Sequence, residues 1–181
     1  MFPGAEARRN VRKVILMPFV NMKAGLSLKA GLILIAGAAL NAPGRPAMAQ
    51  EIITLTQTPC QFIEAEGRDL GFTSQAAADC EKINAGTGTE RLAKARTLRL
   101  KPGEYIFRVM NKNVPYDLGF WIRERDYDWR NPLHKVSKIS VSGGGLAPGA
   151  TKDYKVALRP GEYFYSCPLN PTPNYRIVVE E

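Results

Sequence analysis

The chain has 181 residues, a formal net charge of +8 and three cysteines. Seven of its 25 Lys and Arg residues and one of its 17 acids lie in residues 1–49, so the formal charge of residues 50–181 is about +2. A folded domain with so little excess charge gives no reason to expect nucleic-acid binding.

The segment "MKAGLSLKAGLILIAGAALNAPGRPAMAQ" has the three parts of a secretory signal: a short basic start, an apolar run from Ala30 to Leu40, and Ala-Met-Ala before Gln50. We expect translation from Met22 and cleavage after Ala49. The apolar run is too short to serve as a membrane anchor. The sequence therefore predicts a cleavable leader at 1–49 and one periplasmic or secreted domain at 50–181, with no stable membrane anchor after cleavage.

The first part of this domain predicts a strand followed by helix. "EIITLTQTP" is rich in β-branched residues with period-2 alternation and predicts a first strand that ends at Pro59. "TSQAAADCEKINAG" offers Thr73 or Ser74 as an N-cap and a stop between Asn84 and Gly86. We therefore expect a small helical insertion, about residues 63–96, between two strands.

From Leu98 onward the pattern is one of short strands separated by Pro-Gly turns. "LKPGEY" at 100–105 recurs as "LRPGEY" at 158–163, and each copy resembles the tyrosine corner of Greek-key sandwiches, in which the tyrosine hydroxyl bonds back to the backbone. The predicted fold is all-β: a Greek-key antiparallel β-sandwich with a small helical insertion.

Three places in this pattern stand where a blue-copper protein keeps its ligands. Cys167 follows a predicted strand and precedes the loop "PLNPTPN", which is the usual position of the thiolate. Asn170 occupies the place of one histidine, and Tyr116 or Asp117 the place of the other. A blue-copper centre needs two imidazoles, and the only histidine is His134, which we expect in a solvent-facing loop. The sequence therefore excludes a mononuclear blue-copper electron carrier.

The chain resembles the EfeO-type cupredoxin-like domains of bacterial periplasmic iron-uptake proteins and other exported proteins. The resemblance covers residues 52–62 and 97–181, and it rests on Cys60, Gly103, Asn111, Asp117, "RPGEYFYSC" and "YRIVV". It implies copper or ferric iron held by thiolate and carboxylate groups. The implied ligands in this chain are Cys60, Cys167 and Asp117, with Glu64 and Glu66 as weaker additions.

The pairing of the three cysteines decides whether these ligands are free. A Cys60–Cys80 disulfide would close a loop of about 20 residues, contribute on the order of 3 kcal/mol, and leave Cys167 as a thiol. A Cys60–Cys167 disulfide would remove the metal site and leave Cys80 as the unpaired cysteine. We favour Cys60–Cys80, although spacing alone does not choose between them.

Two functions remain open. The first is metal handling, with copper or iron as the cofactor. The second is a metal-free interaction module that binds another periplasmic protein through "NVPYDLGFWIRER" or the proline-rich loop after Cys167. We expect no enzymatic activity, because no Ser-His-Asp, Cys-His or paired-carboxylate arrangement is evident.

Overall fold

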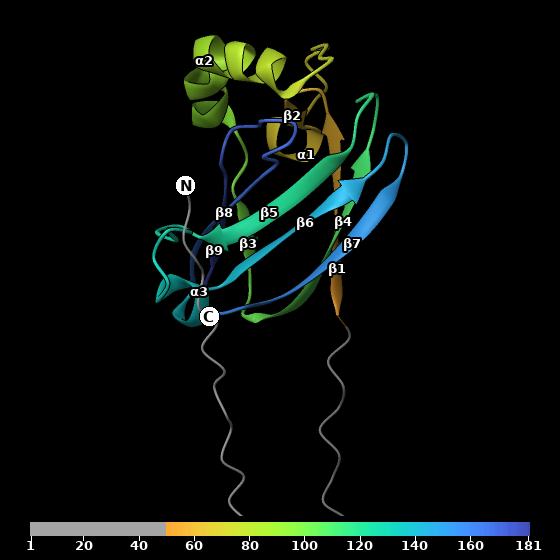
Figure 1. Ribbon diagram of the computed structural model, residues 1–181. Helices are drawn as coiled ribbons and strands as arrows, with labels where there is room; N and C mark the ends of the chain where they lie inside the picture. Colours follow the sequence, from red (N-terminus) through yellow and green to blue (C-terminus); the bar gives the residue numbers. More distant parts are fainter. Residues whose placement is uncertain (1–49) are drawn as a thin grey trace, which may run out of the picture. The chain divides into compact units, whose positions relative to one another are not determined.

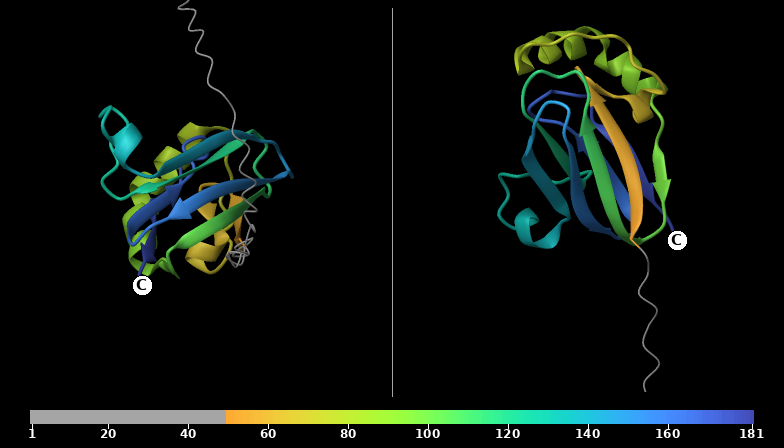
Figure 2. Two further views of the ribbon diagram at one scale, coloured as in Figure 1. Left: turned by 90° about the horizontal axis from the view of Figure 1, so that it is seen from below. Right: turned by 90° about the vertical axis from the view of Figure 1, so that its right-hand side faces the viewer.

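A computed structural model describes residues 50–181, and the leader predicted at 1–49 lies outside this part of the chain. The described domain is a sandwich of two β-sheets, with a long helix across one end (Figures 1 and 2). None of the helices in residues 50–181 is long and apolar enough to span a bilayer.

The first sheet has the strand order β2-β1-β4-β7 and the second the order β3-β9-β8-β5-β6. The strands are β1 (Glu51–Thr58), β2 (Gln61–Phe62), β3 (Leu98–Leu100), β4 (Gly103–Asn111), β5 (Leu118–Glu124), β6 (Ser140–Leu146), β7 (Thr151–Leu158), β8 (Gly161–Ser166) and β9 (Tyr175–Val179). The helices are α1 (Ile63–Glu66), α2 (Ala77–Lys94) and α3 (His134–Ser137). The predicted all-β sandwich with a helical insertion is confirmed.

The core lies between the sheets, where the period-2 alternation of the strands places the apolar side chains. In β7, for example, Tyr154, Val156 and Leu158 are buried while the residues between them are exposed. Aromatic rings from both sheets meet in this core, with the ring centroids of Phe120 and Tyr154 5.1 Å apart. Burial of this apolar surface holds the two sheets together.

The prediction that all strands pair antiparallel is wrong for two pairs. β1 runs parallel to β4, with Gln57 opposite Asn111, and β3 runs parallel to β9. Parallel neighbours need a long crossover connection. The connection here crosses one end of the sandwich in the helical insertion and then returns through β3 to the end where β1 began (Figure 2).

Both Pro-Gly-Glu-Tyr segments form the corners that the sequence predicted. The Tyr105 hydroxyl donates to the carbonyl of Lys101 at 2.7 Å, and the Tyr163 hydroxyl donates to that of Arg159 at 2.9 Å. Both tyrosines are buried. The two corners therefore fasten the same end of the sandwich, where β4 begins and where β7 turns into β8.

The long helix differs from its prediction at both ends. It begins at Ala77, with the Asp79 carboxylate accepting the N–H groups of Gln75 and Ala76, instead of a cap from Thr73 or Ser74. It does not stop at Asn84–Gly86 but continues to Lys94. Contacts with the sandwich, described below, account for the extra turns.

Candidate functional site

Tyr116, Cys167 and Asn170, whose sequence positions were compared above with those of copper ligands, lie at one end of the sandwich, where β1, β4 and β8 end. Asn111, the last residue of β4, is fully buried and shapes the loop that follows. Its Oδ1 accepts the N–H of Val114 at 3.2 Å, and its Nδ2 donates to the carbonyl of Tyr116 at 3.1 Å. This asparagine therefore fixes the backbone of Tyr116 at the place predicted for the first ligand.

Cys167 follows β8 directly and is 1% exposed. Its sulfur accepts the N–H of Asn170 at 3.2 Å and that of Gly119 at 3.4 Å. Burial raises the pKa of the thiol, and the backbone N–H groups offset this only in part. Cys167 is therefore a protonated, covered thiol at neutral pH.

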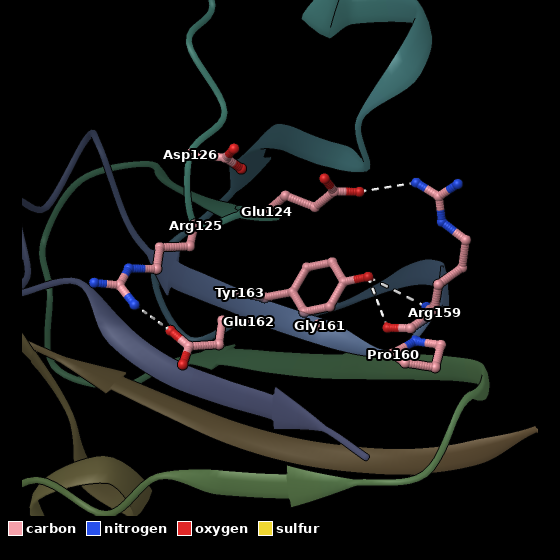
Figure 3. A pocket seen from close by; sticks show the side chains of 8 residues that line it. All are labelled: Glu124, Arg125, Asp126, Arg159, Pro160, Gly161, Glu162 and Tyr163. Carbon is pink, nitrogen blue, oxygen red and sulfur yellow. Dashed lines mark hydrogen bonds and ion pairs between the residues drawn. The ribbon is translucent and has the colours of Figure 1, made fainter. Parts of the chain in front are cut away.

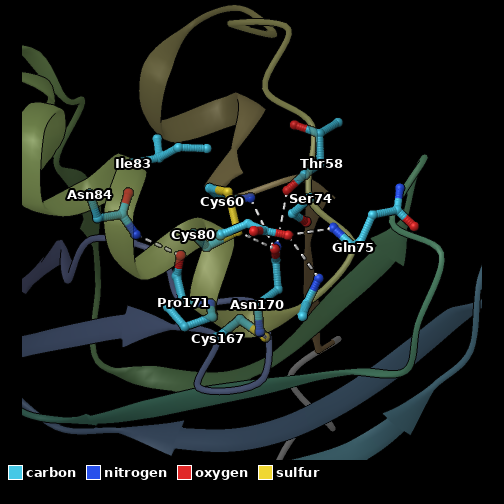
Figure 4. Close-up of a disulfide and its surroundings, with 12 residues drawn as sticks. Thr58, Cys60, Ser74, Gln75, Cys80, Ile83, Asn84, Cys167, Asn170 and Pro171 are labelled. Atoms are coloured by element: carbon cyan, nitrogen blue, oxygen red, sulfur yellow. Dashed lines mark hydrogen bonds between the residues drawn. A yellow bond between two sulfur atoms is a disulfide. The ribbon is translucent and has the colours of Figure 1, made fainter.

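Asn170, at the position of the missing histidine, is fully buried (Figure 4). Its Oδ1 accepts the N–H of Cys60 at 3.0 Å and the Tyr116 hydroxyl at 3.3 Å, while its Nδ2 donates to the carbonyl of Thr58 at 3.0 Å. The amide thus joins β1, the loop after β4 and the loop after β8. It acts as a structural cross-link where an imidazole would face a metal.

Tyr116 is half-buried and also meets the helical insertion. Its hydroxyl lies 2.8 Å from the Ser74 hydroxyl, in the segment that leads into α2. Burial is the main cause that raises the pKa of Tyr116. Its neighbour Asp117 is exposed, so the structure brings Tyr116, Cys167 and Asn170 together but leaves the predicted carboxylate ligand outside.

Cys60 and Cys80 form a disulfide, and Cys167 is a free, buried cysteine. The favoured pairing is therefore the one present. The prediction that Cys60 is a metal ligand is wrong, because the Cys60 sulfur is bonded to that of Cys80. The Cys80 sulfur lies 3.1 Å from Asn170 Oδ1, so the disulfide packs directly on the amide (Figure 4).

A buried ion pair also fastens the helical insertion. Arg91 of α2 lies 2.6 Å from a carboxylate oxygen of Glu66, and their side chains are 8% and 4% exposed. The same carboxylate accepts the Tyr175 hydroxyl of β9. Sequence reasoning missed Arg91 altogether and offered Glu66 only as a minor metal ligand. No local pattern reveals the pair, because 25 residues separate its members.

The other weak candidate, Glu64, is also engaged within the fold. Its carboxylate accepts the N–H of Thr56 in β1 at 2.7 Å. His134 begins α3, and its Nδ1 accepts the N–H of Asp128 at 2.9 Å, so it belongs to a half-buried loop contact and not to the Cys167 end.

This donor set does not fit a copper or iron centre. Within residues 50–181, no group of three or more His, Cys, Asp and Glu side chains is placed to hold a metal ion. The groups that do converge are one protonated thiol, one tyrosine hydroxyl and one amide, and they bond to each other or to backbone. Copper(I) sites use several soft ligands and iron(III) sites several hard anionic ones, and neither set is present here.

An open hollow of about 750 Å³ lies at the opposite end of the sandwich (Figure 3). Its charged groups pair with one another: Arg125 with Glu162 at 2.7 Å and Arg159 with Glu124 at 2.9 Å. The Tyr163 corner forms part of its wall. This hollow is a network of exposed ion pairs and offers no free charge to a ligand.

Comparison with known proteins yields little beyond this geometry. No family model matches the chain, and no curated protein matches it. Among solved structures, the chain is similar to a multi-copper oxidase from Pediococcus acidilactici, with a TM-score of 0.32 and 12% identity over 88% of this chain and 31% of that one. The chain thus spans about a third of that protein's length. The sandwich is established by the strand pairing of the chain itself.

Proposed function

We propose that this chain is an exported, cupredoxin-like binding module that works without a bound metal and recognises another protein of the same compartment. Export is supported by the leader pattern at Met22–Gln50 and by a disulfide of the kind that persists in oxidising compartments. The cupredoxin-like assignment is supported by the order of Asn111, Tyr116, Cys167 and Asn170 at one end of a two-sheet sandwich. No catalytic role is proposed.

The observation that carries the proposal is the saturated side chain of Asn170. Both of its polar atoms bond to groups of the protein, and Tyr116 and the disulfide close over it. A metal at Cys167 would have to break these contacts, and each buried polar group left unpaired costs about 1–3 kcal/mol. The end that would hold copper is therefore better suited to rigid structure than to ligand exchange.

The loops at this end offer a rigid, partly apolar surface next to the buried network. Leu169 is 46% exposed although Cys167 and Asn170 are buried. The preceding Pro168 is exposed, as is Pro115, which precedes Tyr116 in the loop that bonds to Asn170. Exposed apolar groups on stiff loops lose little conformational entropy when they are buried by a partner. We place the binding surface on Pro115, Pro168 and Leu169.

Metal titration tests the metal-free part of the proposal. The domain at 50–181, with its disulfide intact, should bind neither copper(I), copper(II) nor iron(III) with micromolar affinity, because its free thiol is buried and no group of three metal-binding side chains is present among residues 50–181. Binding is measured by metal content after desalting and by thiolate-to-copper(II) charge-transfer absorption. Micromolar binding that disappears in Cys167→Ala would contradict this expectation.

The same titration examines the second candidate, metal handling through Cys167. One observation favours it: the sulfur accepts two backbone N–H groups, a pattern that stabilises a thiolate. If copper(I) binds in the wild type and not in Cys167→Ala, metal handling replaces the metal-free proposal.

Photo-cross-linking in the exporting cell tests partner binding. A photoreactive phenylalanine analogue at Leu169 should give one dominant adduct, because this side chain lies at the centre of the proposed surface. The same analogue at Lys155, an exposed residue in the middle of β7, is the matched control and should give no dominant adduct. Equal adduct patterns from the two positions would argue against the surface on Pro115, Pro168 and Leu169.

A further inference from the structure

The loop between β5 and β6 exposes three large apolar side chains far from the Cys167 end. Trp129 is 59% exposed, Leu133 70% and Val136 84%. Leu133 is the N-cap residue of α3 and has helical backbone angles, and Val136 lies three residues further on, so both side chains lie on one side of this turn. We call these three residues the apolar tip. The loop that carries the tip projects beyond the sheets (Figure 2).

Hydrogen bonds within the loop maintain this exposure. The Asp128 carboxylate accepts the N–H of Arg130 at 2.9 Å, and Asn131 Oδ1 accepts that of Leu133 at 3.0 Å. At the base of the loop, Lys138 lies 2.6 Å from Asp126. These contacts order the loop in the conformation that leaves the three apolar side chains exposed.

Two cations beside the tip have no ion-pair partner in the described part of the chain. Residues 129–136, "WRNPLHKV", contain Arg130 and Lys135 and no acid, and the exposed Asp128 just before them accepts the N–H of Arg130, so residues 128–136 carry a formal charge of +1. Neither cation takes part in an ion pair among residues 50–181, whereas the nearby acids Glu124 and Asp126 are paired with Arg159 and Lys138. The Arg130 guanidinium lies 5.2 Å from the centroid of the Trp129 ring. The tip thus combines apolar groups with cations that have no protein partner.

The tip lies at the end of the sandwich where the first 49 residues join it. β1 begins at Glu51 beside the start of β4, and the start of β4 pairs with the end of β7. The tip loop leaves β5 at this same end, where the Arg125 N–H donates to the carbonyl of Glu162 at the start of β8. The tip therefore lies at the end of the sandwich where β1 begins, opposite the Cys167 end.

We propose that the apolar tip docks this domain peripherally on an anionic lipid surface. Trp129, Leu133 and Val136 enter the headgroup region, and Arg130 and Lys135 contact lipid phosphates. Tryptophan and aliphatic side chains flanked by unpaired cations are the composition that binds such surfaces. A convex tip suits a bilayer better than a protein groove, and each cation should strengthen binding roughly fivefold. This inference is independent of the proposed partner surface, which lies at the other end.

Trp129 itself can report the docking in the full chain, because the chain has only two tryptophans and residues 1–49 contain none. In Trp121→Phe, the emission of Trp129 should shift to the blue and be quenched by brominated lipid on vesicles of equal phosphatidylglycerol and phosphatidylcholine. Pure phosphatidylcholine vesicles should give a much weaker effect. Adding Leu133→Ser and Val136→Ser should weaken binding at least roughly tenfold, and adding Arg130→Gln and Lys135→Gln should weaken it on anionic vesicles alone.

Trp129→Phe is the matched control. Its remaining tryptophan, Trp121, is half-buried on the sheet face and should not respond to vesicles. All tip substitutions are at exposed positions, and thermal unfolding should be unchanged in each variant. An unshifted Trp129 spectrum on anionic vesicles overturns the proposal, as does vesicle binding that the tip substitutions leave unaltered. Cross-linking from Leu169 should be unaffected by these variants, so failure of one proposal does not imply failure of the other.

Discussion

Replacing Arg91 with methionine should lower the free energy of unfolding by about 3–5 kcal/mol. The Arg91 guanidinium and the Glu66 carboxylate are almost fully buried and only 2.6 Å apart. Methionine preserves most of the apolar volume of the side chain but leaves the Glu66 carboxylate in the interior without its counter-charge. The large cost comes from that uncompensated charge more than from any lost packing.

The geometry around Arg91 explains why this position is so sensitive. Beyond Glu66, its guanidinium donates to the carbonyl of Cys60 at 2.9 Å and to Asn84 Oδ1 at 2.7 Å. The Tyr175 hydroxyl of β9 donates to the same carboxylate. Burial, and to a lesser extent the Glu66 carboxylate, raise the pKa of Tyr175 far above its usual value, so the hydroxyl keeps its proton and remains a donor. Arg91 thus links α2 to α1 and to the turn before β2, and Glu66 extends this link to β9 of the second sheet.

Urea unfolding monitored by tryptophan fluorescence measures the loss. Lys94→Met on the same helix is the matched control, because the Lys94–Glu90 pair is 75% and 74% exposed and screened by solvent, so its loss should leave the stability close to that of the wild type. Glu66→Gln combined with Arg91→Met should recover part of the loss, since it removes the stranded charge. An Arg91→Met protein within about 1 kcal/mol of the wild type would mean that the ion pair is open in solution.

Strand patterns could be predicted from the sequence because they are local. The two Pro-Gly-Glu-Tyr corners lie within six residues each, and alternation alone places Tyr154, Val156 and Leu158 on the buried face. The end of α2 could not be predicted in this way. Two glycines near Asn84 cost the helix about 1 kcal/mol each. Its last turns are nevertheless formed, because they carry Arg91 to Glu66 and because Asn84 Nδ2 donates to the carbonyl of Pro171 at 2.7 Å.

In the candidate site, too, local features could be predicted from the sequence and features that depend on long-range packing could not. Tyr116, Cys167 and Asn170 could be placed together because each follows a strand that ends on the same side of the sandwich. The partner of Cys60 and the burial of Glu66 could not be derived, because both depend on how the helical insertion packs, and no strand register constrains it. The insertion also binds Cys60 in a disulfide and brings Ser74 to the Tyr116 hydroxyl and Cys80 to Asn170, and no spacing in the sequence reveals these contacts.

Removing the disulfide by Cys60→Ala and Cys80→Ala should lower the stability by about 3 kcal/mol and uncover the Cys167 thiol. The sequence separation of 20 sets the loop-closure entropy that the unfolded chain regains. In the native state, the Cys80 sulfur packs against the oxygen of Asn170, whose backbone N–H donates to the Cys167 sulfur. Without the disulfide, the Arg91–Glu66 ion pair still holds α2, but the covalent bond beside Asn170 is lost. The end of the sandwich that contains Cys167 should therefore open more often.

Two measurements check the expectation. Urea unfolding gives the loss of stability. The rate at which a thiol reagent labels Cys167 in the native protein at pH 8 measures how often this end opens. Cys167 is 1% exposed and burial raises its pKa, so the intact protein should react slowly. In the double variant the reaction of Cys167 should be at least roughly tenfold faster at low denaturant. Cys167→Ala with the disulfide intact is the control and should show no reaction. Rapid labelling of Cys167 in the intact protein would show that the disulfide and Asn170 do not keep this end closed, and the metal-free proposal would lose its main support.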